Sequence, residues 1–127
     1  MSRLILPYHI RLQEDGRLTV FPTVEVLVQS KRNTGLRTVF QIDSGATVTV
    51  MPTIDARALD IDLRNAKPLV VHGVGIELPG VITRLSLTIG GVRFRAPVVF
   101  IDSIAITRVL GREGVLSRFS IIFAEAR

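Results

Sequence analysis

The sequence predicts a small all-β domain, a barrel or a sandwich, because short segments of alternating apolar and polar residues recur with turn signals between them. The chain has 127 residues, of which 47% are hydrophobic, so it is long enough to bury the core of one domain. It contains no linker, low-complexity tract or internal repeat of usable length. We therefore expect residues 1–127 to form a single domain.

The first part of the chain predicts two hairpins. In the first, Asp15 and Gly16 separate two short apolar-polar alternations, and an Asp-Gly pair supplies the positive φ that a tight turn needs. In the second, residues 24–28 and 36–42 are predicted strands on either side of a turn at 31–35. The last of these strands leads directly into Asp43.

The second part adds a short helix, more strands and a final helical turn. Thr53 is a suitable N-cap for a helix over residues 53–59, which lack strand alternation. A second helix is expected over 113–119, where apolar residues recur at helical spacing. The strands expected between and after these helices are 69–71, 81–89, 92–95, 98–101 and 120–123, with a turn at Gly90 and Gly91.

Composition excludes several classes of protein. The chain has no cysteine, which excludes disulfides, thiol catalysis and thiolate metal sites. No apolar run approaches the roughly 18 residues of a membrane span, and the apolar stretch at 4–6 is too short for the core of a signal peptide. We expect a cytoplasmic protein with no membrane partner.

The net charge of +5 raises the question of nucleic acid, whose phosphates bind Lys and Arg through counterion release. The basic residues are scattered singly, and only Lys31 and Arg32 form a local pair, in the expected turn after Ser30. One Tyr and no Trp leave few platforms for base stacking. A solvated basic surface is the favoured interpretation, and we expect no nucleic-acid partner; a basic β-barrel that binds nucleic acid is the minor alternative.

Asp43 is the residue that most needs a chemical explanation. Burying a carboxylate costs several kcal/mol unless it is paired or hydrogen-bonded. Asp-Ser-Gly by itself is typical of an ordinary turn. Here, however, the tripeptide is flanked by arms that read as buried strand, with Phe40 and Ile42 before it and Val48 and Val50 after it. A second signal is the segment at 109–113, where two apolar residues precede a glycine, an arginine and a glutamate.

With these two motifs, the chain resembles the retropepsin-like aspartic proteases over roughly residues 22–123. The resemblance implies a small closed acid-protease β-barrel with one short C-terminal helix. It implies that Leu110, Gly111 and Arg112 pack structurally against the Asp-Ser-Gly loop. It also implies a homodimer that acts on peptides and needs no cofactor or metal.

The resemblance assigns the catalytic part of the site to Asp43, Ser44 and Gly45. Two Asp43 carboxylates, one from each chain, would meet at a two-fold axis and share one proton. Ser44 would brace the two loops across the axis, and the N–H of Gly45 would hold the carboxylate. Ala46 is expected to contact substrate. Asp102 is excluded as the second carboxylate because Ser103 is followed by Ile104 and not by a glycine of positive φ.

The glycine-bearing stretch 72–80 falls where the family carries its flap, a hairpin that closes over the substrate. We expect His72, Gly73, Val74 and Gly75 to contact substrate from this hairpin. An ordinary glycine-rich loop is the alternative. His72 is interpreted as a surface residue of the flap and not as a catalyst, and with His9 distant in sequence a zinc site is not expected.

The chain departs from the viral pattern beside the active-site motif. Viral members often carry an acidic residue at the position of Thr47 or Val48, which pairs with the arginine that corresponds to Arg112. Glu113, of the same or the other chain, is the replacement partner that we expect for Arg112. The function predicted is a homodimeric aspartic endopeptidase; the alternative is a catalytically silent dimerisation or peptide-binding module of the same fold.

Overall fold

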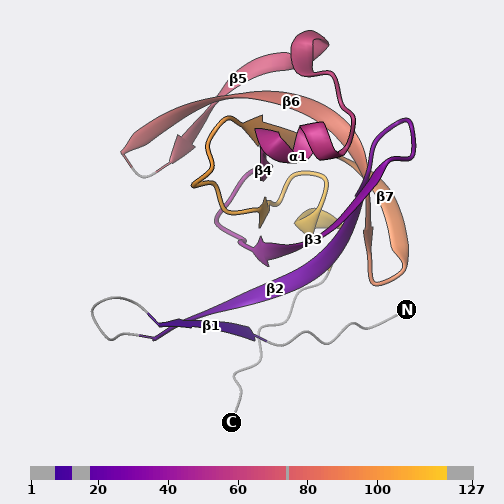
Figure 1. Cartoon of the computed structure of the whole chain (residues 1–127). Helices are drawn as coiled ribbons and strands as arrows, with labels where there is room; N and C mark the ends of the chain where they lie inside the picture. Colours follow the sequence, from indigo (N-terminus) through magenta and orange to yellow (C-terminus); the bar gives the residue numbers. More distant parts are fainter. Residues whose placement is uncertain (1–7, 13–17, 74, 120–127) are drawn as a thin grey trace.

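The structure, a computed structural model, describes residues 8–12, 18–73 and 75–119. The described residues form mostly strands, with few short helices (Figure 1). The strands are β1 Tyr8–Leu12, β2 Leu18–Gln29, β3 Gly35–Ile42, β4 Thr49–Pro52, β5 Lys67–Gly73, β6 Ile76–Ile89, β7 Val92–Ile101 and β8 Val109–Leu110. The helices are α1 Thr53–Ala58 and the 3-10 turns η1 Leu63–Asn65 and η2 Leu116–Arg118.

The strands form one sheet that closes on itself. Their order is β1-β2-β3-β8-β4-β7-β6-β5. β2 also pairs with β6, and this additional pairing closes the six strands from β2 to β6 into a ring. β3 pairs with β8 in parallel, and so does β4 with β7. In the strand order the short strands β8 and β4 lie between β3 and β7, so neither is an edge strand of the sheet. This closed sheet confirms the expected all-β fold.

The core lies inside this curved sheet. Because successive side chains of a strand point to opposite faces, Val24, Val26 and Val28 of β2 all face inward and are buried. Phe40 of β3 and Phe100 of β7 are the largest fully buried side chains. β3, the strand that leads to Asp43, is therefore anchored in the core by the apolar packing of Phe40.

The structure refines several predicted strand boundaries. β2 is one continuous strand, where the sequence suggested two segments, and β7 likewise runs unbroken through Pro97. β5 ends at Gly73 and β6 begins at Ile76, so most of the stretch 72–80 is strand, as in the expected flap hairpin and unlike the alternative of a glycine-rich loop. The turn predicted at Asp15 and Gly16 and the strand predicted at 120–123 lie outside the described residues.

Both helix predictions need correction. The first helix forms, but Pro52 and not Thr53 is its N-cap, and no side chain caps it. The helix predicted over 113–119 is wrong: a series of turns leads into η2. Gly114 has a φ of 71°, which no α-helix accommodates, although Val115 and Leu116 are buried as the helical spacing suggested. Within the described ranges, no helix has the length and apolar character needed to cross a membrane.

Candidate active site

Asp43 begins the loop 43–48 between β3 and β4 and is half-buried. Its backbone N–H donates to the carbonyl of Leu110 at 3.2 Å, which continues the parallel pairing of β3 with β8 by one residue. Its carbonyl accepts from the N–H of Ala46 at 3.0 Å and closes a tight turn. The backbone of Asp43 is therefore fixed on both sides, while its carboxylate still reaches solvent.

Gly45 holds the carboxylate of Asp43. Its N–H donates to Oδ1 of Asp43 over 2.9 Å, as expected from the sequence. A Cβ at Gly45 would lie 3.2 Å from the same oxygen, which is tighter than ordinary van der Waals contact. Gly45 is not among the described glycines with positive φ. The sequence argument from φ is therefore wrong here: glycine leaves room for the carboxylate, which a Cβ would crowd by a few tenths of an ångström.

Gly111 lies directly against the same loop. A Cβ at this position would stand 2.3 Å from the backbone carbon of Val48 and 2.4 Å from its oxygen, so any side chain would collide with main chain. The Gly111 N–H donates to the hydroxyl of Thr49 at 3.0 Å, and this bond is buried. Only glycine permits this approach between β8 and the start of β4.

Backbone hydrogen bonds join the residues after Gly111 to the active-site loop. The N–H of Arg112 donates to the carbonyl of Ala46 at 2.9 Å, and the N–H of Glu113 donates to the carbonyl of Thr47 at 2.9 Å. Leu110, Gly111 and Arg112 thus lie beside the loop that contains Asp-Ser-Gly. Ser44 and Thr47 remain exposed on this loop.

The predicted flap is a hairpin of β5 and β6. The two strands pair from Lys67↔Ile82 to Gly73↔Ile76, with Gly75 in the connection between them. Val74, which the sequence also assigned to substrate contact, lies outside the described residues. Gly75 has a φ of 71°, which glycine adopts without strain. The tip of this hairpin and the loop that follows β3 lie on the same side of the molecule (Figure 1).

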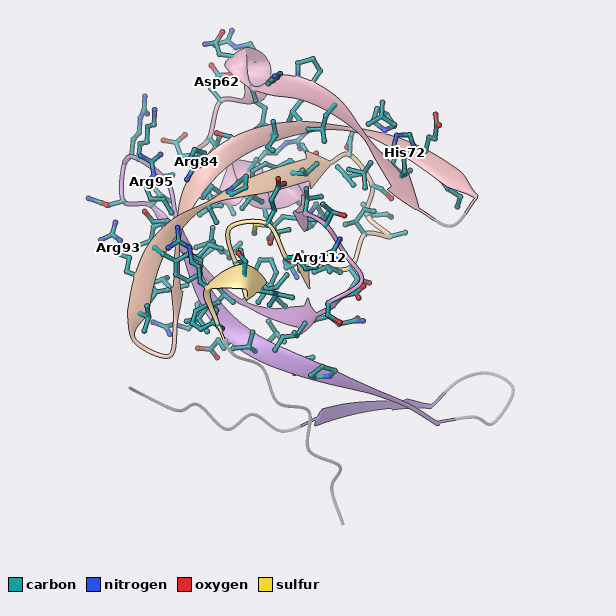
Figure 2. All side chains as sticks on the ribbon, turned by 180° about the vertical axis from the view of Figure 1, so that it is seen from behind. Asp62, His72, Arg84, Arg93, Arg95 and Arg112 are labelled. Carbon is teal, nitrogen blue, oxygen red and sulfur yellow. The ribbon has the colours of Figure 1, made fainter. Side chains whose placement is uncertain are left out.

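His72 lies on the surface of this hairpin, as expected. Its imidazole Nδ1 is 3.4 Å from Oε1 of Glu77, the residue directly opposite it in the ladder, and both side chains are 72% exposed. Figure 2 shows His72 near the hairpin tip, well apart from the three labelled arginines of β6 and β7. Within the described part of the chain, no group of His, Asp and Glu side chains is arranged to hold a metal ion.

The profile of the aspartyl protease family matches residues 24–116. The chain belongs to this family. The match spans the strand that leads to Asp43, the whole active-site loop and the Gly111 segment. No curated protein sequence matches the chain.

Solved structures show the same fold for this family member. Among the matching chains is the protease of the retrovirus EIAV, complexed with the inhibitor HBY-793. The two chains superpose with a TM-score of 0.64 at 21% sequence identity, over 82% of this chain and 93% of the EIAV chain. The fold is therefore that of a retropepsin-like aspartic protease.

Arg112 finds a partner that differs from the one expected for this aspartyl protease. Its Nη2 donates to the hydroxyl of Thr47 at 3.4 Å. The expected pairing with Glu113 of the same chain is not among the ion pairs of the described residues. Thr47 thus occupies the place of the viral acidic residue and accepts one bond from the arginine, with no charge to match.

Sequence reasoning missed Asp55 and Arg108, whose ion pair connects α1 to the residue before β8. Asp55 of α1 is buried, and its Oδ2 accepts from Nε of Arg108 over 2.6 Å. The carboxylate raises the pKa of Arg108 through this bond. A sequence signal existed: Asp55 lies in a helix between Ile54 and Ala56, and a carboxylate beside apolar helix positions calls for a partner.

Proposed function

We propose that the protein is a homodimeric aspartic endopeptidase that hydrolyses extended peptides with a water molecule activated between two Asp43 carboxylates. The observation that carries this proposal is the 2.9 Å hydrogen bond that holds Oδ1 of Asp43 to the N–H of Gly45, in a loop bonded to the Gly111 segment. Membership of the aspartyl protease family supports it. The EIAV protein of the same fold is itself a protease complexed with an inhibitor.

The need for a dimer follows from the number of suitable carboxylates. Asp43 is the only Asp followed by Ser-Gly in the sequence. Asp102 is also followed by a serine, but it lies exposed just after β7, and the Ser103 hydroxyl accepts from the N–H of Ala105 in a local turn. A second Asp43 from an identical chain, related by a two-fold axis, would complete the pair.

The chemistry of such a pair assigns different tasks to two identical groups. Two carboxylates a few ångströms apart do not both ionise readily, so the pair holds one proton. The protonated Asp43 would polarise the scissile carbonyl, and the ionised one would take a proton from the attacking water. Ser44, exposed next to Asp43, would hydrogen-bond across the axis and hold the two loops in register.

The flap hairpin suggests how the substrate would bind. Ile76, next to the turn, has 61% of its surface exposed, so the hairpin presents an apolar side chain together with backbone N–H groups. An extended peptide satisfies such groups by adding to them as a strand does. We therefore propose substrates with apolar side chains around the scissile bond.

The test compares Asp43→Asn with the matched control Asp102→Asn. Cleavage of a library of quenched fluorescent peptides and sedimentation are measured on the same samples. We expect no turnover by Asp43→Asn, because the amide cannot serve as a base, with fold and dimer retained. Asp102→Asn should cleave at the wild-type rate. Wild-type turnover by Asp43→Asn would refute the mechanism, and a dimeric wild type that cleaves no peptide would favour the silent module.

A further inference from the structure

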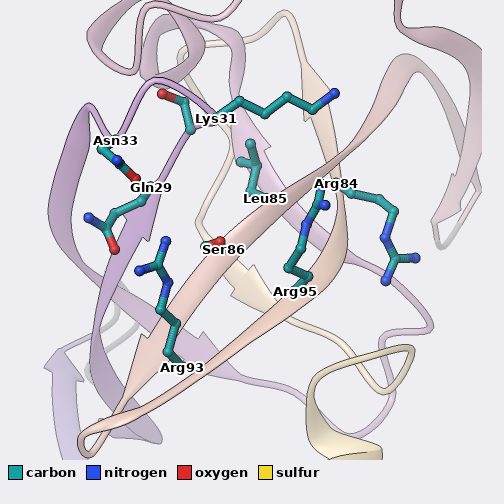
Figure 3. A pocket seen from close by; sticks show the side chains of 9 residues that line it. Gln29, Lys31, Asn33, Arg84, Leu85, Ser86, Arg93 and Arg95 are labelled. Atoms are coloured by element: carbon teal, nitrogen blue, oxygen red, sulfur yellow. The ribbon is translucent and has the colours of Figure 1, made fainter.

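A cationic pocket of about 170 Å³ lies where the β2–β3 turn meets the outer face of β6 and β7. Figure 3 shows Arg93 and Arg95 on either side of Ser86, with Lys31 crossing above. The pocket is on the side of the molecule away from the flap hairpin and Arg112 (Figure 2). Its lining residues are Gln29, Ser30, Lys31, Asn33, Arg84, Leu85, Ser86, Arg93 and Arg95.

Strand register brings these polar side chains to one face. Ser86 of β6 is directly opposite both Gln29 of β2 and Arg95 of β7. Arg84 and Arg93 lie two residues from Ser86 and Arg95, so the strand alternation places them on the same face. The intervening residues of both strands, such as Leu85 and Phe94, are buried in the core. The cluster is therefore a built feature of the sheet.

The positive charges of this pocket have no described counter-charge. Among the residues that the structure describes, Lys31, Arg84, Arg93 and Arg95 take part in no ion pair. Arginines elsewhere do: among the ion pairs are Arg32–Asp60, Arg37–Glu25, Arg64–Asp62 and Arg108–Asp55. Like charges held close together repel, and an anion between them removes that repulsion.

Ser30 lines the pocket at the end of β2 and fixes the turn that carries Lys31 and Asn33. The residue is 6% exposed, and its Oγ is the one buried side-chain oxygen or nitrogen of the described residues that has no hydrogen-bond partner. The backbone of Ser30 is already used in the turn, where its N–H donates to Thr34 and its carbonyl accepts from Asn33. Ser30 follows the inward-facing Val28 by two residues, so its hydroxyl belongs to the inner face and not to the outer face that Gln29 shares with Ser86.

We propose that this pocket binds a phosphate group. Four cationic side chains match the charge of a phosphate monoester, −1.5 to −2 at neutral pH, better than that of a single carboxylate. Guanidinium groups bind phosphate oxygens through paired, charge-assisted hydrogen bonds. The Ser86 hydroxyl and the amides of Gln29 and Asn33 add neutral donors around the arginines. The pocket contains no aromatic side chain for base stacking, which favours a single phosphate over a nucleic-acid strand.

The first experiment titrates the full chain with inorganic phosphate against sodium chloride of equal ionic strength, with binding followed by NMR chemical shifts. Arg93→Gln and Arg95→Gln are compared with Arg57→Gln, an exposed arginine on α1 that serves as the charge control. We expect saturable binding that weakens at least tenfold in each pocket variant and not in the control. Equal affinities in all variants, or the same shifts with chloride, would overturn the proposal. Because Asp43 is not involved, the result is independent of the protease mechanism.

The second experiment uses Ser86→Ala, which removes a hydroxyl from the outer face between Arg93 and Arg95. Phosphate affinity should fall severalfold, because one neutral donor to the anion is lost. Undiminished affinity would show that the hydroxyl does not contact the anion and would overturn its assigned role.

A third arm identifies the source of the phosphate. Tighter binding of a phosphoserine peptide than of inorganic phosphate would assign the site to a phosphorylated protein, and the reverse would assign it to a free phosphate. Affinity for RNA oligonucleotides that increases with their length would overturn the single-phosphate site in favour of strand binding.

Discussion

Asp55 and Arg108, 53 residues apart in the chain, are joined by two hydrogen bonds of 2.6 and 2.8 Å between carboxylate and guanidinium. Asp55 lies on α1, and Arg108 directly precedes β8. The carbonyl of Arg108 accepts from the N–H of Gln41 at 2.9 Å, two residues before Asp43. The ion pair therefore connects the helix after the active-site loop to the strand that carries Asp43.

Breaking this pair should destabilise the fold. The Asp55 side chain is 6% exposed and that of Arg108 is 33% exposed, so the pair lies between an exposed pair, worth about 0.5 kcal/mol, and a fully buried one, whose disruption costs about 3–5 kcal/mol. We expect a coupling of about 2 kcal/mol from a double-mutant cycle of Asp55→Asn and Arg108→Gln, measured by urea unfolding. The exposed pair Glu25–Arg37 is the matched control, and a coupling no larger than that of the control would contradict the supporting role.

Gly111→Ala should disrupt the active-site loop. The added Cβ would stand 2.3 Å from the Val48 backbone, and main chain on both sides cannot move aside without breaking the bond from Gly111 to Thr49. We expect a loss of about 3 kcal/mol or more in the free energy of unfolding. Gly91→Ala is the control, because Gly91 has a φ of 81° and open space around it, so only the backbone cost of about 1–2 kcal/mol applies. Equal losses in the two variants would show that steric contact at Gly111 is unimportant.

Ser44→Ala should weaken dimerisation and peptide cleavage together, if Ser44 hydrogen-bonds across the proposed two-fold axis. Each lost bond is worth about 0.5–1.5 kcal/mol. Ser44→Thr keeps the hydroxyl and should preserve both properties. Ser103→Ala, which removes a hydroxyl used only in a local turn, is the control. Analytical ultracentrifugation gives the dimer dissociation constant, and an unchanged constant in Ser44→Ala would exclude the brace.

The rate of peptide cleavage should be bell-shaped in pH. Mutual repulsion of two nearby carboxylates separates their proton losses, so the singly protonated pair is the active form. Below the lower apparent pKa both groups are protonated and no base remains; above the upper one both are ionised and no acid remains. Initial rates from about pH 3 to 9 decide the matter, and a rate that climbs steadily into alkaline pH would point to a metal-hydroxide or serine mechanism.

Stability must be followed across the acidic end of that profile. Arg64 hydrogen-bonds the carboxylate of Asp62 and lowers its pKa to about 2. A lowered pKa stabilises the fold above the ordinary pKa of Asp, near 4, and this contribution is lost as the pH falls from about 4 to 2. Circular dichroism at each pH separates this loss of stability from the effect of pH on the cleavage step.

Local sequence determined most of the strands and the identity of the active-site loop. Asp43, Ser44 and Gly45 stand out because these small and polar residues interrupt two apolar β-forming segments, a contrast that the linear sequence shows directly. The glycine turns at Gly75 and Gly90 are predicted for the same reason, since a tight turn restricts the local backbone. Several strand lengths were underestimated and the two-residue strand β8 was missed, because neighbouring strands extend pairing through residues without a strong preference of their own.

Tertiary structure alone decided the contacts between distant segments. The reason for glycine at 111 is the Val48 backbone, more than 60 residues earlier in the chain, and no local pattern encodes that approach. The C-terminal helix gave way to turns because Gly114 adopts a positive φ where a Cβ would lie 2.7 Å from Pro97. The Asp55–Arg108 pair and the cationic pocket likewise arise from strand register, which depends on how the whole sheet closes and not on any single segment.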